Sequence, residues 1–359
     1  MRVKSVPNSH AITGISDKPY SGLDVPKYTP YKDGKGRIDF GTTPVVVGKK
    51  SNGRSMLGDT IETSIFDVDK YWPFYLNQKN WLLDNCRSSV YQDINKKKSI
   101  KAHREMRHLC LWHVSDLESE NLPRAGANPN WEDWGYDAGL FDRASGSGGS
   151  NPRFIYRNYY GGPTFEIWGD RGDKYGLEEL ARSVQEDLCI LRRTDNGWVL
   201  RAAAVCFPSY WSLNKKMGKP LIIDDNADLL DGLDEESPVE RFEWMLTPDV
   251  QLYQPSPVRK KFPTKIDDSN IAWSIFIRTE RQIFMKLPNN DVLFTTRTYL
   301  NSLVSVCQNE ETALGLKSSM LNTPTEMLKY RGIDNYGSEV IRYIDRMWVT
   351  PSGCAGFHR

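Results

Sequence analysis

The stretch from Ile271 to Leu300 constrains the fold of this chain more than any other. Its first half alternates side chains with the period of a β-strand, and its second half, from Val292, is rich in β-branched and aromatic residues. Between the halves, the residues 288–291 (Pro-Asn-Asn-Asp) have the composition of a turn. We therefore predict a long β-hairpin that pairs Ile271–Lys286 with Asp291–Leu300. The two faces of its first strand consist of Trp273, Ile275, Ile277, Thr279, Arg281, Ile283 and Met285, and of Phe276, Arg278, Glu280, Gln282 and Phe284.

Arg278 and Glu280 stand two residues apart on one face of this strand, among phenylalanines. An arginine in such a place needs an anion nearby, because an unpaired buried charge is costly. Glu280 could supply it as a structural ion pair within the sheet. Alternatively, Arg278 could be held for the carboxylate of a ligand. We expect the two side chains to lie close together at the wall of a cavity.

The net charge, the apolar content and the cysteine spacing argue against several classes of protein. The 359 residues carry 47 Lys+Arg and 46 Asp+Glu, a formal charge of +1, which gives no support for binding nucleic acid or an anionic membrane. The chain has no long apolar run and its N-terminus has no apolar signal segment, so we expect a soluble cytoplasmic protein. The six cysteines form no C-x-x-C pair, which argues against a zinc site or a disulfide framework.

The pattern along the chain predicts three regions. Residues 1–60 are rich in Pro, Gly, Lys and Ser and form an extended arm, in which Thr43–Val47 could add an edge strand. Residues 61–310 form the core and include a long loop near 118–151. Residues 311–359 form a C-terminal helical extension.

Within the core, residues 67–114 have helical spacing and predict one or two surface helices. A helix near 177–184 then precedes strands at 188–191 and 198–207, joined by the turn Thr194-Asp195-Asn196-Gly197. Antiparallel strands joined by tight turns, with helices outside the run, define an α+β fold.

Two short helices are predicted after Leu303. The first has Thr323 as N-cap and Gly332 just past its end, and the second has Ser338 as N-cap.

The common catalytic motifs are absent. There is no P-loop, no G-x-G-x-x-G behind a strand, no G-x-S-x-G and no H-E-x-x-H. His103, His108 and His113 are spaced five apart and so do not share a helix face, although one of them could be a haem ligand. The acidic runs 224–228 and 231–236 lack the spacing of a calcium loop and are expected to be solvated.

Five blocks of the chain, in order and with matching spacing, resemble the haem-dependent oxidative N-demethylase family. The blocks are Val184-Gln185-Glu186-Asp187; Val205-Cys206-Phe207-Pro208-Ser209 with Trp211; Lys216-Met217-Gly218-Lys219-Pro220-Leu221; Arg278-Thr279-Glu280-Arg281-Gln282 with Leu287-Pro288; and Phe294-Thr295-Thr296-Arg297-Thr298-Tyr299-Leu300. The resemblance extends from about Trp81 to about Trp348. It implies a PAS-like fold that holds haem b, receives electrons from a flavin and iron–sulfur partner, and demethylates a small secondary or tertiary amine.

In the family, the K-x-G-x-P-L block leads into Ile-His-x-Pro-Val-Pro, whose histidine is associated with the haem. This chain has Asp225 at that place, and a carboxylate is a poor axial ligand for haem iron. The resemblance implies Asp225, Lys216 and Arg281 as cofactor-binding residues. It implies Arg278 and Glu280 as catalytic residues, able to serve a propionate or an amine.

Three hypotheses follow from these patterns. The first is a divergent haem oxidoreductase that acts on a small amine. The second is a haem-free PAS-like module that binds a small molecule or a partner protein without catalysis. The third is a structural subunit whose Pro/Gly/Ser-rich arms contact other chains.

Overall fold

The structure of the protein is a computed structural model. The residues it describes are 45–46, 72–94, 140–143, 154–157, 165–166, 177–178, 180–182, 184–220, 227–234, 238–257, 265–287 and 289–348. Asp225, the histidines and most of the predicted arm and long loop lie outside these ranges. The division into three regions therefore stays a prediction.

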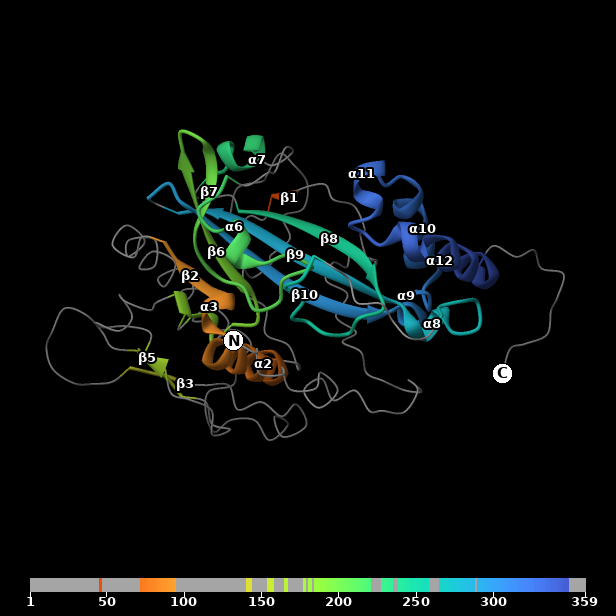
Figure 1. Cartoon of the computed structure of the whole chain (residues 1–359), viewed down its shortest axis with the longest axis horizontal. Helices are drawn as coiled ribbons and strands as arrows, with labels where there is room; N and C mark the ends of the chain where they lie inside the picture. Colours follow the sequence, from red (N-terminus) through yellow and green to blue (C-terminus); the bar gives the residue numbers. More distant parts are fainter. Residues whose placement is uncertain are drawn as a thin grey trace, which may run out of the picture.

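An antiparallel sheet of seven strands organises this part of the chain, in the order β1-β8-β9-β10-β6-β7-β2 (Figure 1). The strands are β1 (Val45–Val46), β2 (Tyr91–Asp93), β6 (Asp187–Thr194), β7 (Gly197–Ala204), β8 (Val239–Thr247), β9 (Phe276–Lys286) and β10 (Val292–Ser302). The α+β class is confirmed. A separate three-stranded sheet consists of β3 (Leu140–Arg143), β4 (Phe154–Arg157) and β5 (Phe165–Glu166).

The long hairpin is confirmed, because β9 and β10 pair along their whole length with Thr298 opposite Glu280. One end differs from the prediction. Ile271–Ser274 forms the short helix α8, and the strand begins only at Phe276. Alternation over two or three residues does not distinguish a strand from a helical turn, and here Ile271 is buried while Trp273 is exposed.

The hairpin β6–β7 turns at Asp195-Asn196, as predicted. Gly197 has a φ of +100°, a conformation that a residue with a side chain rarely adopts, so glycine is required there. The edge strand predicted in Thr43–Val47 is also present, since β1 pairs with the start of β8.

Helices cover both faces of the sheet. α2 (Trp72–Asn85) packs on one face and is continued by the short α3 (Arg87–Val90). The prediction of surface helices was wrong for α2, because it buries Tyr75, Leu76, Lys79, Leu82 and Leu83. On the opposite face, α6 (Leu213–Lys216) and α7 (Ala227–Asp231) contribute Leu213 and Leu230 to a second cluster.

The C-terminal part contains more helix than predicted: α9 (Leu303–Val306), α10 (Glu310–Leu321), α11 (Thr325–Leu328) and α12 (Ile333–Trp348). In Figure 1, α10 and α12 lie together at one end of the sheet, near α8 and α9. Ser338 lies inside α12 and is not an N-cap, and Pro324 rather than Thr323 precedes α11. Gly332, with a φ of +70°, allows the chain to leave α11 and start α12 at Ile333, six residues before the start that Ser338 as N-cap predicts.

No helix within the described ranges is long and apolar enough to cross a membrane.

Candidate functional site

Arg278 is fully buried in β9, and its hydrogen-bond acceptors among the described residues are all neutral. Its Nε–H donates to Ser209 Oγ at 2.7 Å, and its Nη2 donates to the carbonyl oxygens of Phe207 at 2.7 Å and Leu252 at 3.1 Å. Nη1 donates to the carbonyl of Gln251 at 3.3 Å. The guanidinium therefore fixes two loops, 207–209 and 251–252, over this face of the sheet.

Glu280 lies beside Arg278 on the same face and is 7% exposed. Its Oε1 accepts the hydroxyl proton of Ser209, and its Oε2 accepts the side-chain amide of Gln282 at 3.0 Å. Arg278 and Glu280 are thus linked through Ser209 and not by direct contact. Both donors to the carboxylate are neutral, so Glu280 can still bind a cation.

The loop that carries Ser209 is held by hydrogen bonds with buried charged residues. Asp187, at the start of β6, accepts the backbone N–H groups of Cys206 and Phe207, each at 2.8 Å. Lys79 of α2 donates to the carbonyl oxygens of Val184, at 2.9 Å, and Glu186. Burial raises the pKa of Asp187 to about 6, and burial lowers the pKa of Lys79.

The residue after Ser209 has an unusual backbone. Tyr210 has a φ of 61°, in the left-handed region that residues with a side chain seldom occupy. Its N–H donates to the carbonyl of Gln254, and its hydroxyl is hydrogen-bonded with that of Thr247 at 2.8 Å. Strain of this kind is concentrated at functional sites, where surrounding contacts enforce it.

The hydrogen-bond chain continues from Glu280 to β8. Gln282 accepts from Arg241 Nε at 2.7 Å, and the Arg241 guanidinium lies 5.0 Å from the ring centroid of Phe284. Phe284 is stacked on Phe294 with the centroids 4.6 Å apart. An arginine and an aromatic pair therefore stand next to the polar residues on one face.

A second carboxylate, that of Glu243, is directly opposite Glu280 in the β8–β9 register. Arg331 Nη2 donates to Glu243 Oε2 at 3.4 Å. Burial is the main cause that raises the pKa of Glu243, and the charge of Glu280 adds to it. The neighbouring Tyr330 is 38% exposed, yet burial of its hydroxyl and the charges of Glu280 and Glu243 raise its pKa.

Lys216, predicted to bind the cofactor, ends α6 on this face. Its Nζ lies 4.4 Å from the centroid of the Trp211 ring. The residue as a whole is exposed, but desolvation of its ammonium lowers the pKa, and Glu280 acts in the opposite direction. Lys216, Arg241, Arg278 and Glu280 therefore lie on the same side of the sheet and are called here the polar cluster.

Arg281 is separated from this cluster by the sheet. It projects from the opposite face of β9, where its Nε donates to Glu240 Oε1, and both residues are buried. The structure thus brings together Arg278, Glu280 and Lys216 and leaves Arg281 apart. Asp225, and with it the expected cavity wall facing Asp225, lies outside the described residues.

Four residues of the cluster were missed as site residues from the sequence: Arg241, Glu243, Tyr330 and Arg331. They come from segments that carry no motif, and only the register of β8 against β9 brings the first two next to Glu280. Ser209 did stand in one of the five blocks that resemble the family, which was a usable signal.

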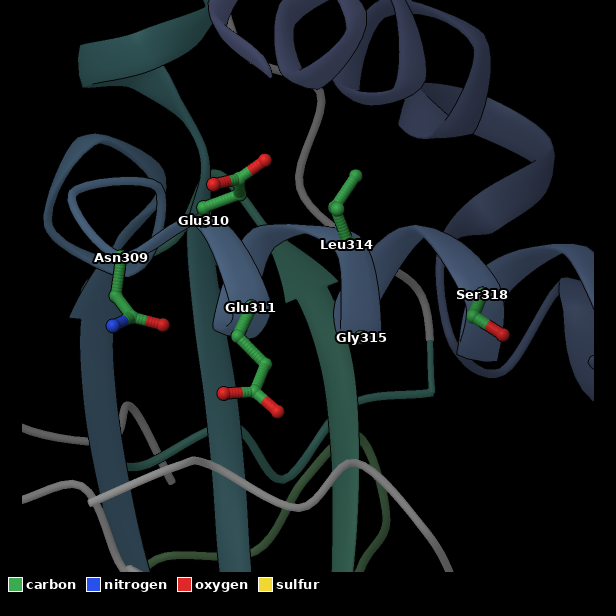
Figure 2. Close-up of a pocket in the computed structure, with 6 residues that line it drawn as sticks. All are labelled: Asn309, Glu310, Glu311, Leu314, Gly315 and Ser318. Atoms are coloured by element: carbon green, nitrogen blue, oxygen red, sulfur yellow. The ribbon is translucent and has the colours of Figure 1, made fainter. Parts of the chain in front are cut away.

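A separate hollow of about 620 Å³ lies over α10, lined by Asn309, Glu310, Glu311, Leu314, Gly315 and Ser318. Figure 2 shows the carboxylates of Glu310 and Glu311 pointing in different directions, so they do not converge on one ligand. This hollow is not a candidate site.

Metal-binding side chains do not cluster in the described part of the chain, which has no group of three His, Cys, Asp or Glu suited to a metal ion. All five histidines lie outside it. Cys189, Cys206 and Cys307 are buried free thiols, and burial raises their pKa.

Fold and site together define an α+β protein with a buried, hydrogen-bonded carboxylate among arginines on one face of its sheet. A family model described as haem-dependent oxidative N-demethylase, alpha subunit-like, matches residues 141–223 and 225–341. This match covers more than half of the chain, and the chain belongs to that family. The two matched segments are divided at Asp224, next to Asp225.

Proposed function

We propose that this protein is a divergent haem-dependent oxidoreductase of the oxidative N-demethylase type that acts on a small amine. The observation that carries the proposal is Glu280. The residue is 7% exposed, its carboxylate accepts from the neutral groups of Ser209 and Gln282, and it forms no direct ion pair with any other described residue. A buried carboxylate of this kind is suited to the ammonium group of a small amine.

The described residues fit the acidic edge of a haem b. Its propionates require cations at the rim of the site, and Lys216 and Arg241 are two cations that each lie against an aromatic ring on the Glu280 face. The stacked pair Phe284–Phe294 adds apolar surface there. When bound, a haem would supply the oxidising centre for the N-methyl group. All five histidines, the commonest metal ligands, lie outside the described ranges.

The protein's own residues would do three things in this proposal. Glu280 would bind and orient the amine, Arg278 would hold Ser209 and the loops that form the wall, and Lys216 would attract carboxylates. The electrons would come from a flavin and iron–sulfur partner protein, which is part of the same proposal.

A haem-free PAS-like module that binds a small molecule or a partner protein is the second candidate. The observation that favours it is Asp225 at the place of the family's histidine. In this case the same polar cluster would bind a cationic ligand without catalysis.

Titration with hemin tests the two candidates. Binding is measured from the Soret absorption band for three proteins: the wild type, Asp225→His and the matched control Asp228→His. The control adds a histidine three residues away. The oxidoreductase requires stoichiometric binding by the wild type. Binding by Asp225→His alone would support the haem-free candidate, and binding by none of the three would remove haem from the proposal.

A further inference from the structure

Glu243, Glu280 and Thr298 form one row across three strands, called here the acid row. Glu243 of β8 is directly opposite Glu280, and Glu280 is directly opposite Thr298 of β10. Side chains at directly opposite positions of antiparallel strands share a face and have Cβ atoms about 4.5–5.5 Å apart. The two carboxylates are therefore neighbours on the face that carries Lys216 and Arg241.

The two carboxylates of the acid row differ in how well they are stabilised. Glu280 accepts hydrogen bonds on both oxygens, whereas among the described residues Glu243 accepts one, the 3.4 Å contact from Arg331. The side chain of Glu243 is 18% exposed, so water adds little to the stabilisation of its carboxylate. Like charges directly opposite each other are unfavourable, and the carboxylate with fewer donors is the one that takes up a proton more readily.

The third member of the acid row, Thr298, has a hydroxyl group without a hydrogen-bond partner among the described residues. Its side chain is fully buried. It is aimed at the Glu280 face because it is directly opposite Glu280 in the register. A buried polar group of this kind indicates a ligand that completes it.

Cations around the acid row favour the loss of a proton from an ammonium ion bound at Glu280. Arg241 and Arg278 flank the row on β8 and β9, Arg331 contacts Glu243, Lys216 lies on the same side of the sheet in α6, and the charges of both carboxylates act on the Tyr330 hydroxyl. These four cations against two carboxylates raise the free energy of adding a further positive charge.

We infer that Glu243 is the proton acceptor of this site: an alkylammonium ion bound at Glu280 transfers its proton to Glu243. In this step the N–H bond breaks, an O–H bond forms on the Glu243 carboxylate, and the electron pair stays on nitrogen. Nothing is oxidised or reduced. The amine then has the free lone pair that oxidation of an N-methyl group requires. The inference rests on the proposed amine substrate.

The ligand-free protein provides the first test. The protein is labelled with ¹³C-glutamate and its infrared spectrum is recorded as a function of pH. The label separates the carboxyl signals of glutamic acid from the carboxyl signal of Asp187. We expect a protonated glutamate well above the usual pKa of 4.5. This signal disappears in Glu243→Gln, moves to lower pH in Glu280→Gln, and is unchanged in the control Glu326→Gln, which alters an exposed residue of α11. A wild-type signal that survives Glu243→Gln would overturn the inference.

Two cations of similar size provide the second test. Trimethylammonium carries a transferable proton and tetramethylammonium does not. At a pH where Glu243 is ionised, we expect trimethylammonium to add one glutamic acid signal to the wild type and none to Glu243→Gln, and tetramethylammonium to add none to either. Calorimetry records binding independently. Binding of trimethylammonium without the signal overturns the role of Glu243 and leaves the amine site standing, whereas no binding of either cation overturns both.

Discussion

Arg278 and Glu280 are linked by one hydroxyl group, that of Ser209. Arg278 Nε–H donates to Ser209 Oγ at 2.7 Å, and the Ser209 hydroxyl donates to Glu280. The arginine therefore stabilises the carboxylate through Ser209 and leaves it available to a ligand. A direct ion pair would have occupied the same oxygen.

Arg278→Leu is expected to lower the free energy of unfolding by roughly 3 kcal/mol or more, because each buried acceptor that loses its donor costs roughly 1–3 kcal/mol. The carbonyl groups of Phe207 and Leu252 and the hydroxyl of Ser209 would all lose a donor. Urea denaturation measures the loss.

The matched control is Arg342→Leu. Arg342 is also paired, with Asp268 and Glu339, but its side chain is 53% exposed. Exposed ion pairs contribute under about 1 kcal/mol. Equal losses for the two variants would contradict the structural role of Arg278.

Ser209→Ala and Glu280→Gln are expected to be non-additive. Ser209→Ala removes the hydrogen bond between the two residues and Glu280→Gln replaces its charged acceptor by a neutral one, so a double-mutant cycle should give a coupling energy of about 0.5–3 kcal/mol. A coupling near zero would mean that Ser209 does not connect Arg278 to Glu280 in solution.

The hairpin and its faces could be predicted because strand alternation over eleven residues is a strong local signal, and it correctly grouped Arg278, Glu280 and Gln282. The burial of α2 could not be predicted in the same way. That helix contains Lys79, a residue typical of surfaces, and its ammonium is satisfied only by carbonyl groups more than one hundred residues away.

The candidate site was predictable only in part for a similar reason. Arg278 and Glu280 lie on one strand, so the sequence alone places them together. Glu243 reaches Glu280 through the pairing of β8 with β9, and Arg331 reaches Glu243 from the turn before α12. The register has no local signature, and the glycine that marks the turn, Gly332, does not indicate the partner of Arg331.

Arg281 and Glu240 provide a test that separates structure from cofactor binding. Each is buried on the face opposite Glu280. Arg281→Met or Glu240→Leu alone should cost roughly 3–5 kcal/mol, because each leaves one buried charge without its partner. The double variant should return close to the wild type in urea denaturation, since an apolar pair of similar volume replaces a buried ion pair at little cost. If the double variant folds but loses a hemin affinity that the wild type has, Arg281 takes part in cofactor binding after all.

The pH dependence of stability should reveal Asp187. Burial raises its pKa to about 6 from the ordinary 3.8, so the folded protein binds this proton more tightly than the unfolded chain does. The contribution of Asp187 to the free energy of unfolding is fully present below about pH 4 and is lost as the pH rises through about 6. Two pKa units correspond to about 3 kcal/mol.

Asp187→Asn removes this titration, so the stability of the wild type relative to the variant should fall across that range. The variant also loses one acceptor for the N–H groups of Cys206 and Phe207, which lowers its stability at every pH. Asp267→Asn is the control with the opposite sign, because hydrogen bonds from Ser269 lower the pKa of Asp267, and its contribution is lost as the pH falls. Parallel pH profiles for the wild type and Asp187→Asn in urea denaturation would show that Asp187 keeps an ordinary pKa. The residue that holds the Ser209 loop would then be a carboxylate that is ionised at every pH above its ordinary pKa.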